Sequence, residues 1–365
     1  MKVHRDLLSI PPAVHGAIDY GELERYGIGL EEVVDFSENS NPFGPSPIVR
    51  EAMMSANLAR YPDRECWALR RALADHLACS VDEIVVGNGA AELIWLVGFA
   101  FMHPQARVLI VGPTFGEYAR TAQLMGAQVI EWRAQQEDDF QLDLLALSVA
   151  LQTHKPQIVF LCTPNNPTGF ITPITTIEEW AVAHPQILFV IDEAYIDFVP
   201  DTPSAHTLGL PNVLTICSMT KAYALAGLRL GYALGPPSLI MPLSQARIPW
   251  SVNEVAQVAG IAALADQTYL QRTLTRLTTA TQTLSAQLAE AGYPTVPSAT
   301  HYKLIHVGNQ HESASTFRSK LLPYGILVRD CASFGLPTYV RIAAKQERAN
   351  ERLISGVKKS SSGTA

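Results

Sequence analysis

Three short polar segments, each directly after a run of apolar residues, carry the side chains best suited to chemistry. They are residues 163–169 (TPNNPTG), 192–195 (DEAY) and 218–229 (SMTKAYALAGLR). Together they supply a lysine, a carboxylate, an amide, a phenol, hydroxyls and a guanidinium. In an open sheet of parallel strands, segments that follow the strands meet in one crevice at their carboxyl ends. The spacing therefore predicts one shared site.

This set of groups is what pyridoxal 5′-phosphate (PLP) requires of a protein. A lysine forms an imine with the cofactor and later moves protons. A carboxylate keeps the pyridine nitrogen protonated, and hydroxyls, a cation and backbone N–H groups bind the phosphate. The residues that fill these roles are Lys221, Asp192, Asn166, Tyr195, Ser218, Thr220 and Arg229. The sequence therefore predicts an enzyme that carries PLP as a Schiff base on Lys221.

The order and spacing of the Asn-Pro-Thr-Gly, Asp-x-x-Tyr and Ser-x-x-Lys…Arg elements resemble the class I/II aminotransferases, a fold-type I family of PLP enzymes. The resemblance covers essentially the whole chain. It implies that Lys221, Asp192 and Tyr195 are catalytic. The further cofactor contacts that it implies are Gly89, Ala90 and Ala91 at the phosphate, Phe115 stacked on the ring, and Tyr61 reaching a neighbouring subunit. It thereby implies a homodimer with shared active sites.

Within this family, several stretches are similar to histidinol-phosphate aminotransferases and threonine-phosphate decarboxylases. Residues 35–45 (DFSENSNPFGP) resemble a segment of both, and residues 249–253 (PWSVN) and 328–334 (VRDCASF) favour the decarboxylases. The resemblance implies that Arg341 binds a substrate anion, because a guanidinium fits a carboxylate or phosphate with two hydrogen bonds. The other substrate-binding residues that it implies are Arg329, Asn41, Glu38 and His15.

The reaction depends on which bond at the substrate Cα lies perpendicular to the imine plane, and we expect Arg341 to set this orientation. A perpendicular C–H bond gives transamination, racemisation or elimination, and a perpendicular C–COO⁻ bond gives decarboxylation. We expect an aminotransferase that acts on an amino acid or amino-phosphate. One alternative is a decarboxylase of the threonine-phosphate type.

A second alternative concerns acidic side chains near the substrate. Asp19 and Glu38 would favour a cationic substrate end. This would suit a PLP-dependent lyase or cyclase that converts hydroxyarginine to products of the enduracididine or capreomycidine type. A PLP-binding transcription regulator is a further possibility, but it would need a basic DNA-binding domain for which the chain has no room.

The elements that must position these residues alternate between apolar runs and amphipathic stretches. Strands are expected at residues 83–86, 107–111, 127–131, 157–162, 187–191, 213–217 and 230–233, and helices at 91–102 and 116–125. Such alternation predicts a mostly parallel sheet with helices on both faces. The predicted fold class is α/β: a three-layer PLP-transferase fold with this sheet in a large domain, plus a smaller α+β domain.

The smaller domain is expected after a Pro-free helical stretch at residues 254–291. It would contain strands at 302–307, 325–328 and 339–342 and a last helix at 346–357. The predicted division is an N-terminal arm at 1–45, a large PLP-binding domain at 46–250, an interdomain helix with the small domain at 251–358, and a disordered tail at 359–365.

Composition limits the partners. The 365 residues are 48% hydrophobic and 17% charged, with a net charge of −7, so we expect no nucleic-acid or membrane partner beside the small-molecule amino-acid substrate. No signal peptide or apolar run of about 18 residues is present. The five cysteines match no metal-binding spacing, and reduced thiols are typical of the cytoplasm. We therefore expect a cytoplasmic enzyme of amino-acid biosynthesis that holds no metal.

Overall fold

A seven-stranded sheet forms the centre of the structure, a computed structural model that describes residues 8–308 and 313–362. The strand order is β2-β8-β7-β6-β5-β3-β4. Strands β7 to β4 in this order are parallel, whereas β8 is antiparallel to both β7 and β2. The strands are β2 (Ile84–Gly87), β3 (Arg107–Gly112), β4 (Gln128–Arg133), β5 (Ile158–Cys162), β6 (Leu188–Asp192), β7 (Val213–Ser218) and β8 (Gly231–Leu234).

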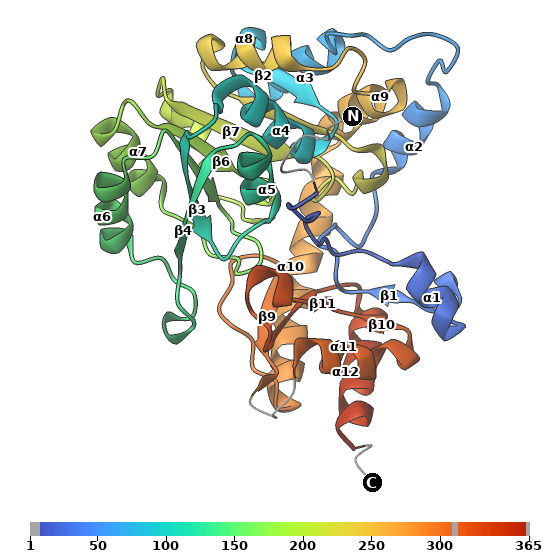
Figure 1. Ribbon diagram of the computed structural model, residues 1–365. Coiled ribbons are helices and arrows are strands. Elements are labelled where there is room, and N and C mark those ends of the chain that lie inside the picture. The colour runs from blue at the N-terminus through green and yellow to red at the C-terminus, as the bar shows by residue number, and fades with distance from the viewer. Residues whose placement is uncertain (1–7, 309–312, 363–365) are drawn as a thin grey trace.

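Helices cover both faces of this sheet (Figure 1). Alternate residues of a strand point to opposite faces, and in β3 Ile110 packs on one side while Leu109 and Val111 pack on the other. The helices on the first side are α4 (Gly89–Phe101), α5 (Glu117–Leu124) and α8 (Pro237–Ala246), and those on the second are α6 (Leu144–His154) and α7 (Ile174–Ala183). The predicted three-layer α/β fold is therefore confirmed.

A smaller part of the molecule lies at one end of the large sheet (Figure 1). Its antiparallel sheet has the order β11-β12-β9, and a parallel pair joins β1 to β10. These strands are β1 (Val34–Asp35), β9 (Tyr302–His306), β10 (Ile326–Leu327), β11 (Arg329–Asp330) and β12 (Tyr339–Ala343). The helices here are α1 (Tyr20–Tyr26), α11 (Ala314–Leu321) and α12 (Glu347–Ser362).

The long helical stretch predicted at residues 254–291 is two helices, α9 (Glu254–Ala265) and α10 (Gln267–Glu290). They are separated at Asp266, whose carboxylate accepts a hydrogen bond from the Tyr269 N–H at 3.1 Å and caps α10. Helix α9 packs against α2 (Pro47–Met54) and α3 (Trp67–Leu77). We therefore propose that the smaller domain begins at Asp266 and not at residue 251.

The predicted disordered tail begins too early. Helix α12 continues to Ser362, so residues 359–362 are helical, and residues 363–365 lie outside the described part of the chain. Within that part, no helix combines the length and the apolar character that crossing a membrane requires.

Candidate active site

Lys221 lies three residues after β7, at the carboxyl edge of the large sheet. Its backbone carbonyl accepts hydrogen bonds from the N–H groups of Asn41 (2.9 Å) and Ala224 (3.1 Å). Its ammonium group is 5.9 Å from the centre of the Tyr195 ring. Burial, followed by the charge of nearby Arg341, lowers the pKa of Lys221 to about 8. A lysine with this pKa exchanges its proton readily near neutral pH.

Asp192 is the last residue of β6 and is buried. Its Oδ2 atom accepts a hydrogen bond from the Tyr118 hydroxyl (2.6 Å), and its Oδ1 atom accepts one from the Ala194 N–H (2.9 Å). Burial raises the pKa of Asp192, and these hydrogen bonds oppose the rise. No Lys, Arg or His of the described residues forms an ion pair with it. The carboxylate is therefore available to a cationic group in the cavity.

Tyr118 is a contact of Asp192 that the sequence interpretation missed. It lies in the first turn of α5, three residues after Phe115, and its ring stacks on Phe160 with 4.9 Å between ring centres. Burial raises the pKa of Tyr118 well above its ordinary value, so its hydroxyl remains a donor. The three-residue spacing between Phe115 and Tyr118 could have indicated that both face the site. Aromatic residues at this spacing are also common on the buried face of a helix, so the spacing alone was not specific.

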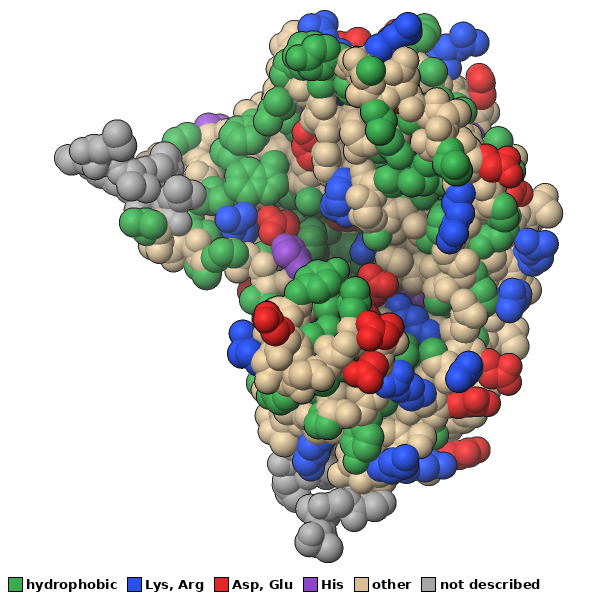
Figure 2. Space-filling view, turned by 90° about the vertical axis from the view of Figure 1, so that its right-hand side faces the viewer, with side chains coloured by type: hydrophobic (Ala, Val, Ile, Leu, Met, Phe, Trp, Pro, Cys, Tyr) green, Lys and Arg blue, Asp and Glu red, His purple; other side chains and the backbone are tan. Residues whose placement is uncertain are grey.

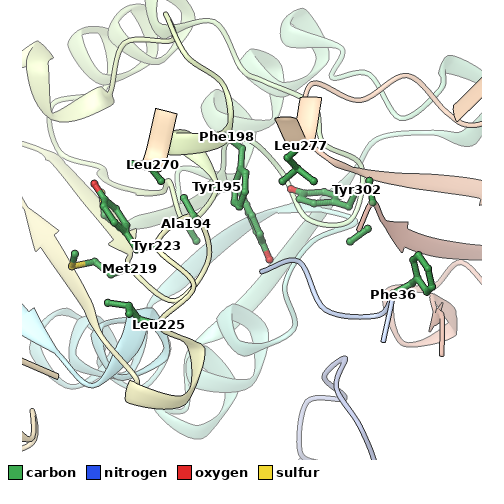
Figure 3. Packing of buried hydrophobic residues seen from close by; sticks show 14 of the residues in the cluster. Phe36, Ala194, Tyr195, Phe198, Met219, Tyr223, Leu225, Leu270, Leu277 and Tyr302 are labelled. Carbon is green, nitrogen blue, oxygen red and sulfur yellow. The ribbon is translucent and has the colours of Figure 1, made fainter. Parts of the chain in front are cut away.

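Tyr195 and Asn166 reach the cavity from two loops after neighbouring strands. The Tyr195 hydroxyl accepts a hydrogen bond from Asn39 Nδ2 at 3.2 Å, and Figure 3 shows this hydroxyl pointing toward the N-terminal segment, with the Tyr302 ring beside it. Burial raises the pKa of Tyr195 to about 12, so the phenol stays protonated. The Oδ1 atom of Asn166 accepts a hydrogen bond from Arg341 Nη1. The Asn166 amide hydrogens thus remain available to a ligand.

Hydroxyls, a guanidinium and the start of α4 gather at the other end of the cavity. Ser218 Oγ and Thr220 Oγ1 are 2.6 Å apart. The first N–H groups of α4, including that of Ala90, have no partner within the helix and favour an anion. Gly89 has a φ of +76°, and a Cβ there would lie 2.7 Å from Arg229 Nη2. Glycine therefore lets the Arg229 guanidinium lie against the start of the helix.

These groups enclose a cavity of about 110 Å³. It is lined by Ala90, Ala91, Phe115, Tyr118, Cys162, Asn166, Asp192, Ala194, Tyr195, Ser218, Thr220, Lys221 and Arg229. Two of the predicted cofactor residues are not in this lining. Gly89 lies against Arg229, which does line the cavity. Tyr61 is 81% exposed, and its ring stacks on Trp250 with 4.7 Å between ring centres. The structure brings together all the others.

Arg341 and Arg329 lie directly opposite each other on the antiparallel strands β12 and β11, so their side chains share one face. Both are buried, with 4% and 6% of the residue exposed. Arg341 donates to Asn166 Oδ1 and to the Ser37 carbonyl, and its Nε has no partner. Among the described residues, neither guanidinium forms an ion pair with a carboxylate. Two buried guanidinium groups without an ion pair among the described residues can accommodate an anion.

Arg329 is oriented by the N-terminal arm. Its Nη2 donates to the Val14 carbonyl (2.7 Å) and to Ser333 Oγ (2.6 Å), and its Nη1 donates to the His15 carbonyl (3.0 Å). A guanidinium has five N–H groups. Two of those on Arg329 therefore remain for a ligand.

Asn41 and Glu38 are predicted substrate residues that contact other parts of the protein. Asn41 Nδ2 donates to the Ala222 carbonyl and to Thr273 Oγ1, both at 3.0 Å, which uses both amide hydrogens. Asn41 thus ties the Lys221 segment to α10, and substrate binding by this residue stays a prediction. A Glu38 carboxylate oxygen lies 3.7 Å from Lys345 Nζ, so its charge is already paired.

The family model of aminotransferase class I and II matches residues 31–357. The chain belongs to this family. It is 33% identical to a histidinol-phosphate aminotransferase from Moorella thermoacetica, over 98% of this chain and 92% of that protein, and 35% identical to one from Symbiobacterium thermophilum, over 91% of each. The predicted family, enzyme class and cofactor are thereby confirmed: this is a PLP-dependent aminotransferase.

Solved structures of aminotransferases and a related decarboxylase share the fold. Histidinol-phosphate aminotransferase from Sinorhizobium meliloti, in complex with PLP, aligns with a TM-score of 0.88 and 26% identity over 100% of this chain and 99% of that one. L-threonine-O-3-phosphate decarboxylase from Porphyromonas gingivalis aligns with a TM-score of 0.79 and 25% identity, over 90% and 99%.

The residues of the cavity fit PLP. Buried Asp192 accepts two hydrogen bonds but forms no ion pair with a described Lys, Arg or His, which suits a protonated ring nitrogen. Arg229 forms no ion pair with any described carboxylate and lines the same cavity as the Ser218 and Thr220 hydroxyls, which suits a phosphate. Within residues 8–308 and 313–362, no cluster of three or more His, Cys, Asp and Glu side chains is arranged to hold a metal ion.

Proposed function

We propose that Lys221 is the residue that binds the aldehyde of PLP covalently. The proposed contacts are Asp192 with the pyridine nitrogen, Asn166 and Tyr195 with the ring oxygen, Phe115 with the ring face, and Ser218, Thr220, Arg229 and the N–H groups of Ala90 and Ala91 with the phosphate. The support is that these groups line one cavity and that Lys221, Asp192 and Arg229 form no ion pair within the described part of the chain. Borohydride reduction of the holoenzyme should attach the cofactor to a single lysine peptide, and a label on any peptide without Lys221 would refute the assignment.

When bound, PLP supplies an electron sink for the bond that breaks at the substrate Cα. The residues of the chain supply orientation and proton transfer. Lys221, with a pKa of about 8, accepts and returns the Cα proton. The hydrogen bonds from the Tyr118 hydroxyl and the Ala194 N–H favour the ionised form of Asp192, and this carboxylate would hold a proton on the ring nitrogen.

We propose that the substrates are an amino-phosphate and an acidic 2-oxo acid or its amino acid. The observation that carries this proposal is the buried Arg329–Arg341 pair, whose two charges lack a carboxylate among the described residues. The relatives named for histidinol phosphate point to the same chemistry, because a phosphate or carboxylate binds a guanidinium with two hydrogen bonds. Histidinol phosphate is the first candidate to test.

Neither alternative reaction gains support from the site. A guanidino substrate would need free carboxylates, but Glu38 is paired with Lys345 and Asp19 caps α1 by accepting a hydrogen bond from the Glu22 N–H at 3.0 Å. Decarboxylation would need the carboxylate bond perpendicular to the cofactor plane. The comparisons favour transamination.

The deciding experiment incubates the holoenzyme separately with histidinol phosphate plus 2-oxoglutarate, O-phospho-L-threonine, and L-arginine, and identifies products by mass spectrometry. Transfer of the amino group to give glutamate supports the proposal. Loss of carbon dioxide from O-phospho-L-threonine, or modification of arginine without amino transfer, would replace it with the corresponding alternative.

We also propose that the enzyme is a homodimer in which Tyr61 reaches the partner's phosphate site. The support is that Tyr61 stacks on Trp250 and that further apolar side chains of the two segments that carry them are exposed: Met54, Leu58 and Ile248. Figure 2 views the side where α2 and α9 lie, and hydrophobic side chains gather there above the hollow between the two parts. Sedimentation at micromolar concentration should give a dimer.

We propose a cytoplasmic location, as the sequence suggested. All five cysteines are free thiols, and four of them are buried. Free thiols are typical of a reducing compartment. Fractionation of cells that express the natural gene at its normal level would test the location.

A further inference from the structure

The N-terminal residues 13–16 lie between the two parts of the molecule, beside the proposed anion site. An ideal Cβ on Gly16 would be 2.5 Å from the Ser37 carbonyl oxygen, the atom that also accepts a hydrogen bond from Arg341. A Cβ on Gly116, at the start of α5, would be 3.4 Å from the Ala13 Cβ. The arm is therefore in close contact with both the small domain and the cofactor domain.

The arm holds Arg329 through its backbone. The carbonyl oxygens of Val14 and His15 accept hydrogen bonds from the two terminal nitrogens of the guanidinium, at 2.7 and 3.0 Å. Ser333 Oγ is its third partner, at 2.6 Å. Arg329 has no described carboxylate partner, so the hydrogen bonds from its guanidinium to the arm help to set its position relative to Arg341.

The side chain of His15 also attaches the arm to the cofactor domain. His15 Nε2 lies 3.0 Å from Glu117 Oε1, and the His15 ring is 5.3 Å from the ring of Phe115. Glu117 is buried, and its other oxygen accepts a hydrogen bond from Trp95 Nε1 at 3.2 Å and lies 3.6 Å from Arg120. The hydrogen bond from Trp95 fixes the carboxylate that holds His15, whereas Arg120 lies beyond hydrogen-bond distance of it.

We propose that His15 and Glu117 are positioning residues that link the cofactor domain to the anion site, by holding the arm whose carbonyls orient Arg329. His15 would then act on the substrate through Arg329 and would not touch it. A binding group gains affinity when its supporting residues hold it in the bound geometry. This inference rests on the proposed role of Arg329 in binding the substrate anion.

The hydrogen bond between His15 and Glu117 also stabilises the ionised form of Glu117. Its pKa is lowered, chiefly by the hydrogen bond from His15. The contact between His15 and Glu117 is therefore energetically favourable as well as short.

The test is the first half-reaction of the holoenzyme with L-glutamate, followed by the absorbance of the cofactor in a stopped-flow instrument. His15→Ala and Glu117→Ala should each raise the apparent Kd for L-glutamate about tenfold, with the limiting rate changed less than about threefold. Glu117→Gln keeps an acceptor oxygen for His15 and should restore Kd to within about threefold of the wild type. The visible spectrum of the bound cofactor should be the same in all variants.

The double variant His15→Ala/Glu117→Ala should bind L-glutamate no more weakly than either single variant, because both changes release the same arm. Arg120→Gln removes the other charge near Glu117 and is the matched control, with an unchanged Kd expected. Unchanged Kd values in both single variants, or additive losses in the double variant, would overturn the inference. A Glu117→Gln variant as weak as Glu117→Ala would do so too.

Arg329→Gln separates this inference from the proposed function. If it leaves Kd for L-glutamate unchanged, the anion-binding role of Arg329 is wrong and the inference falls with it. If it weakens binding while His15→Ala and Glu117→Ala do not, Arg329 binds the anion but the arm does not position it.

Discussion

Lys221 is a cation that the protein without cofactor must bury close to a second cation, Arg341. Burial is the main reason that its pKa falls from 10.5 to about 8. Between these two pH values the unfolded chain binds more protons than the folded one, so the stability of the apoprotein should rise with pH across this window. Below pH 8 both states are protonated, and the folded state bears the full destabilisation.

We expect that Lys221→Met stabilises the apoprotein. At pH 7 the gain should be about 3–4 kcal/mol, because each unit of pKa shift corresponds to about 1.4 kcal/mol. The gain should shrink as the pH rises from 8 to 10.5, because the wild-type lysine loses its charge in the folded state across this window while it stays protonated in the unfolded chain. Urea unfolding at pH 7 and pH 10 measures the difference. Lys359→Met, at an exposed position of α12, is the control, and equal gains for both variants would contradict the explanation.

Tyr118 should control the ionisation of Asp192. Tyr118→Phe removes the 2.6 Å hydrogen bond, and because that bond lowers the Asp192 pKa, its loss should raise the pKa. We expect kcat to fall about tenfold, in line with the roughly 1.5–3 kcal/mol of a hydrogen bond to a charged group. The loss should be larger at acid pH, since more Asp192 is then neutral.

The pH profile of kcat is the measurement for this variant. Its acid limb should move to higher pH in Tyr118→Phe. Tyr339→Phe removes a buried hydroxyl in the smaller part of the molecule and should leave the profile unchanged. An acid limb that stays in place in Tyr118→Phe would show that the hydroxyl does not support the carboxylate.

The start of α4 depends on the absence of a side chain at Gly89. In Gly89→Ala, the new Cβ would meet Arg229 Nη2 at 2.7 Å, and the φ of +76° would be strained for alanine. We expect the variant to bind PLP at least about tenfold more weakly, because the guanidinium must move away from the helix start. Fluorescence titration of the apoprotein with PLP gives the affinity.

Gly209→Ala separates backbone strain from the contact with Arg229. Gly209 also has a positive φ, +61°, but nothing lies within 4 Å of the position of its Cβ. This variant should lose about 1 kcal/mol of stability and keep its PLP affinity. Equal losses of affinity in the two variants would mean that strain, and not the guanidinium, causes the effect.

Among the helices and strands, the sequence predicted those whose positions follow from the local pattern of apolar residues. The strand β5 is a continuous buried run, so both its place and its burial could be predicted. The break at Asp266 was missed because no Pro or Gly marks it and α9 and α10 are both helical in period. Asn41 was assigned to the substrate because its segment resembles a substrate-binding one, but only the packed structure shows that Ala222 and Thr273 use its amide hydrogens.

The contacts between distant segments had no local signal. Glu117 meets His15 across about a hundred residues of sequence, and Tyr118 meets Asp192 across more than seventy. Such pairs depend on how α5 and the N-terminal arm are placed on the sheet. The cofactor residues were predictable for the opposite reason, since each follows directly after a strand of one sheet.

At the scale of the whole molecule, the proposed dimer makes a quantitative prediction. If Tyr61 serves the partner's active site, each site takes its Lys221 from one chain and its Tyr61 from the other. Lys221→Ala and Tyr61→Ala then damage contributions that different chains make to a site. Co-expression should then form heterodimers with one intact site, and a random mixture should regain about a quarter of wild-type activity. Each variant alone should be inactive or weak.

A matched mixture tests whether the recovery comes from sharing. Lys221→Ala combined with Asp192→Ala places both defects on the same chain's site, so no intact site forms and no activity should return. Recovery in this mixture, or none in the first, would contradict the sharing of active sites.

Strand β1 pairs Val34 with Ile326 in β10, and the Phe36 carbonyl accepts a hydrogen bond from the Ala343 N–H at 3.0 Å. A ribosome that adds about 5–20 residues per second needs roughly 15–60 s to make the chain between these partners. The segment that holds Arg341 and Lys221 in place can therefore pair only after β10 and β12 have been synthesised, long after its own synthesis. A nascent chain released before β12 is made would contain the strands of the large sheet but would lack Arg341 and the pairing of β12 with the Phe36 segment. Premature termination should therefore yield inactive protein rather than a partly active enzyme.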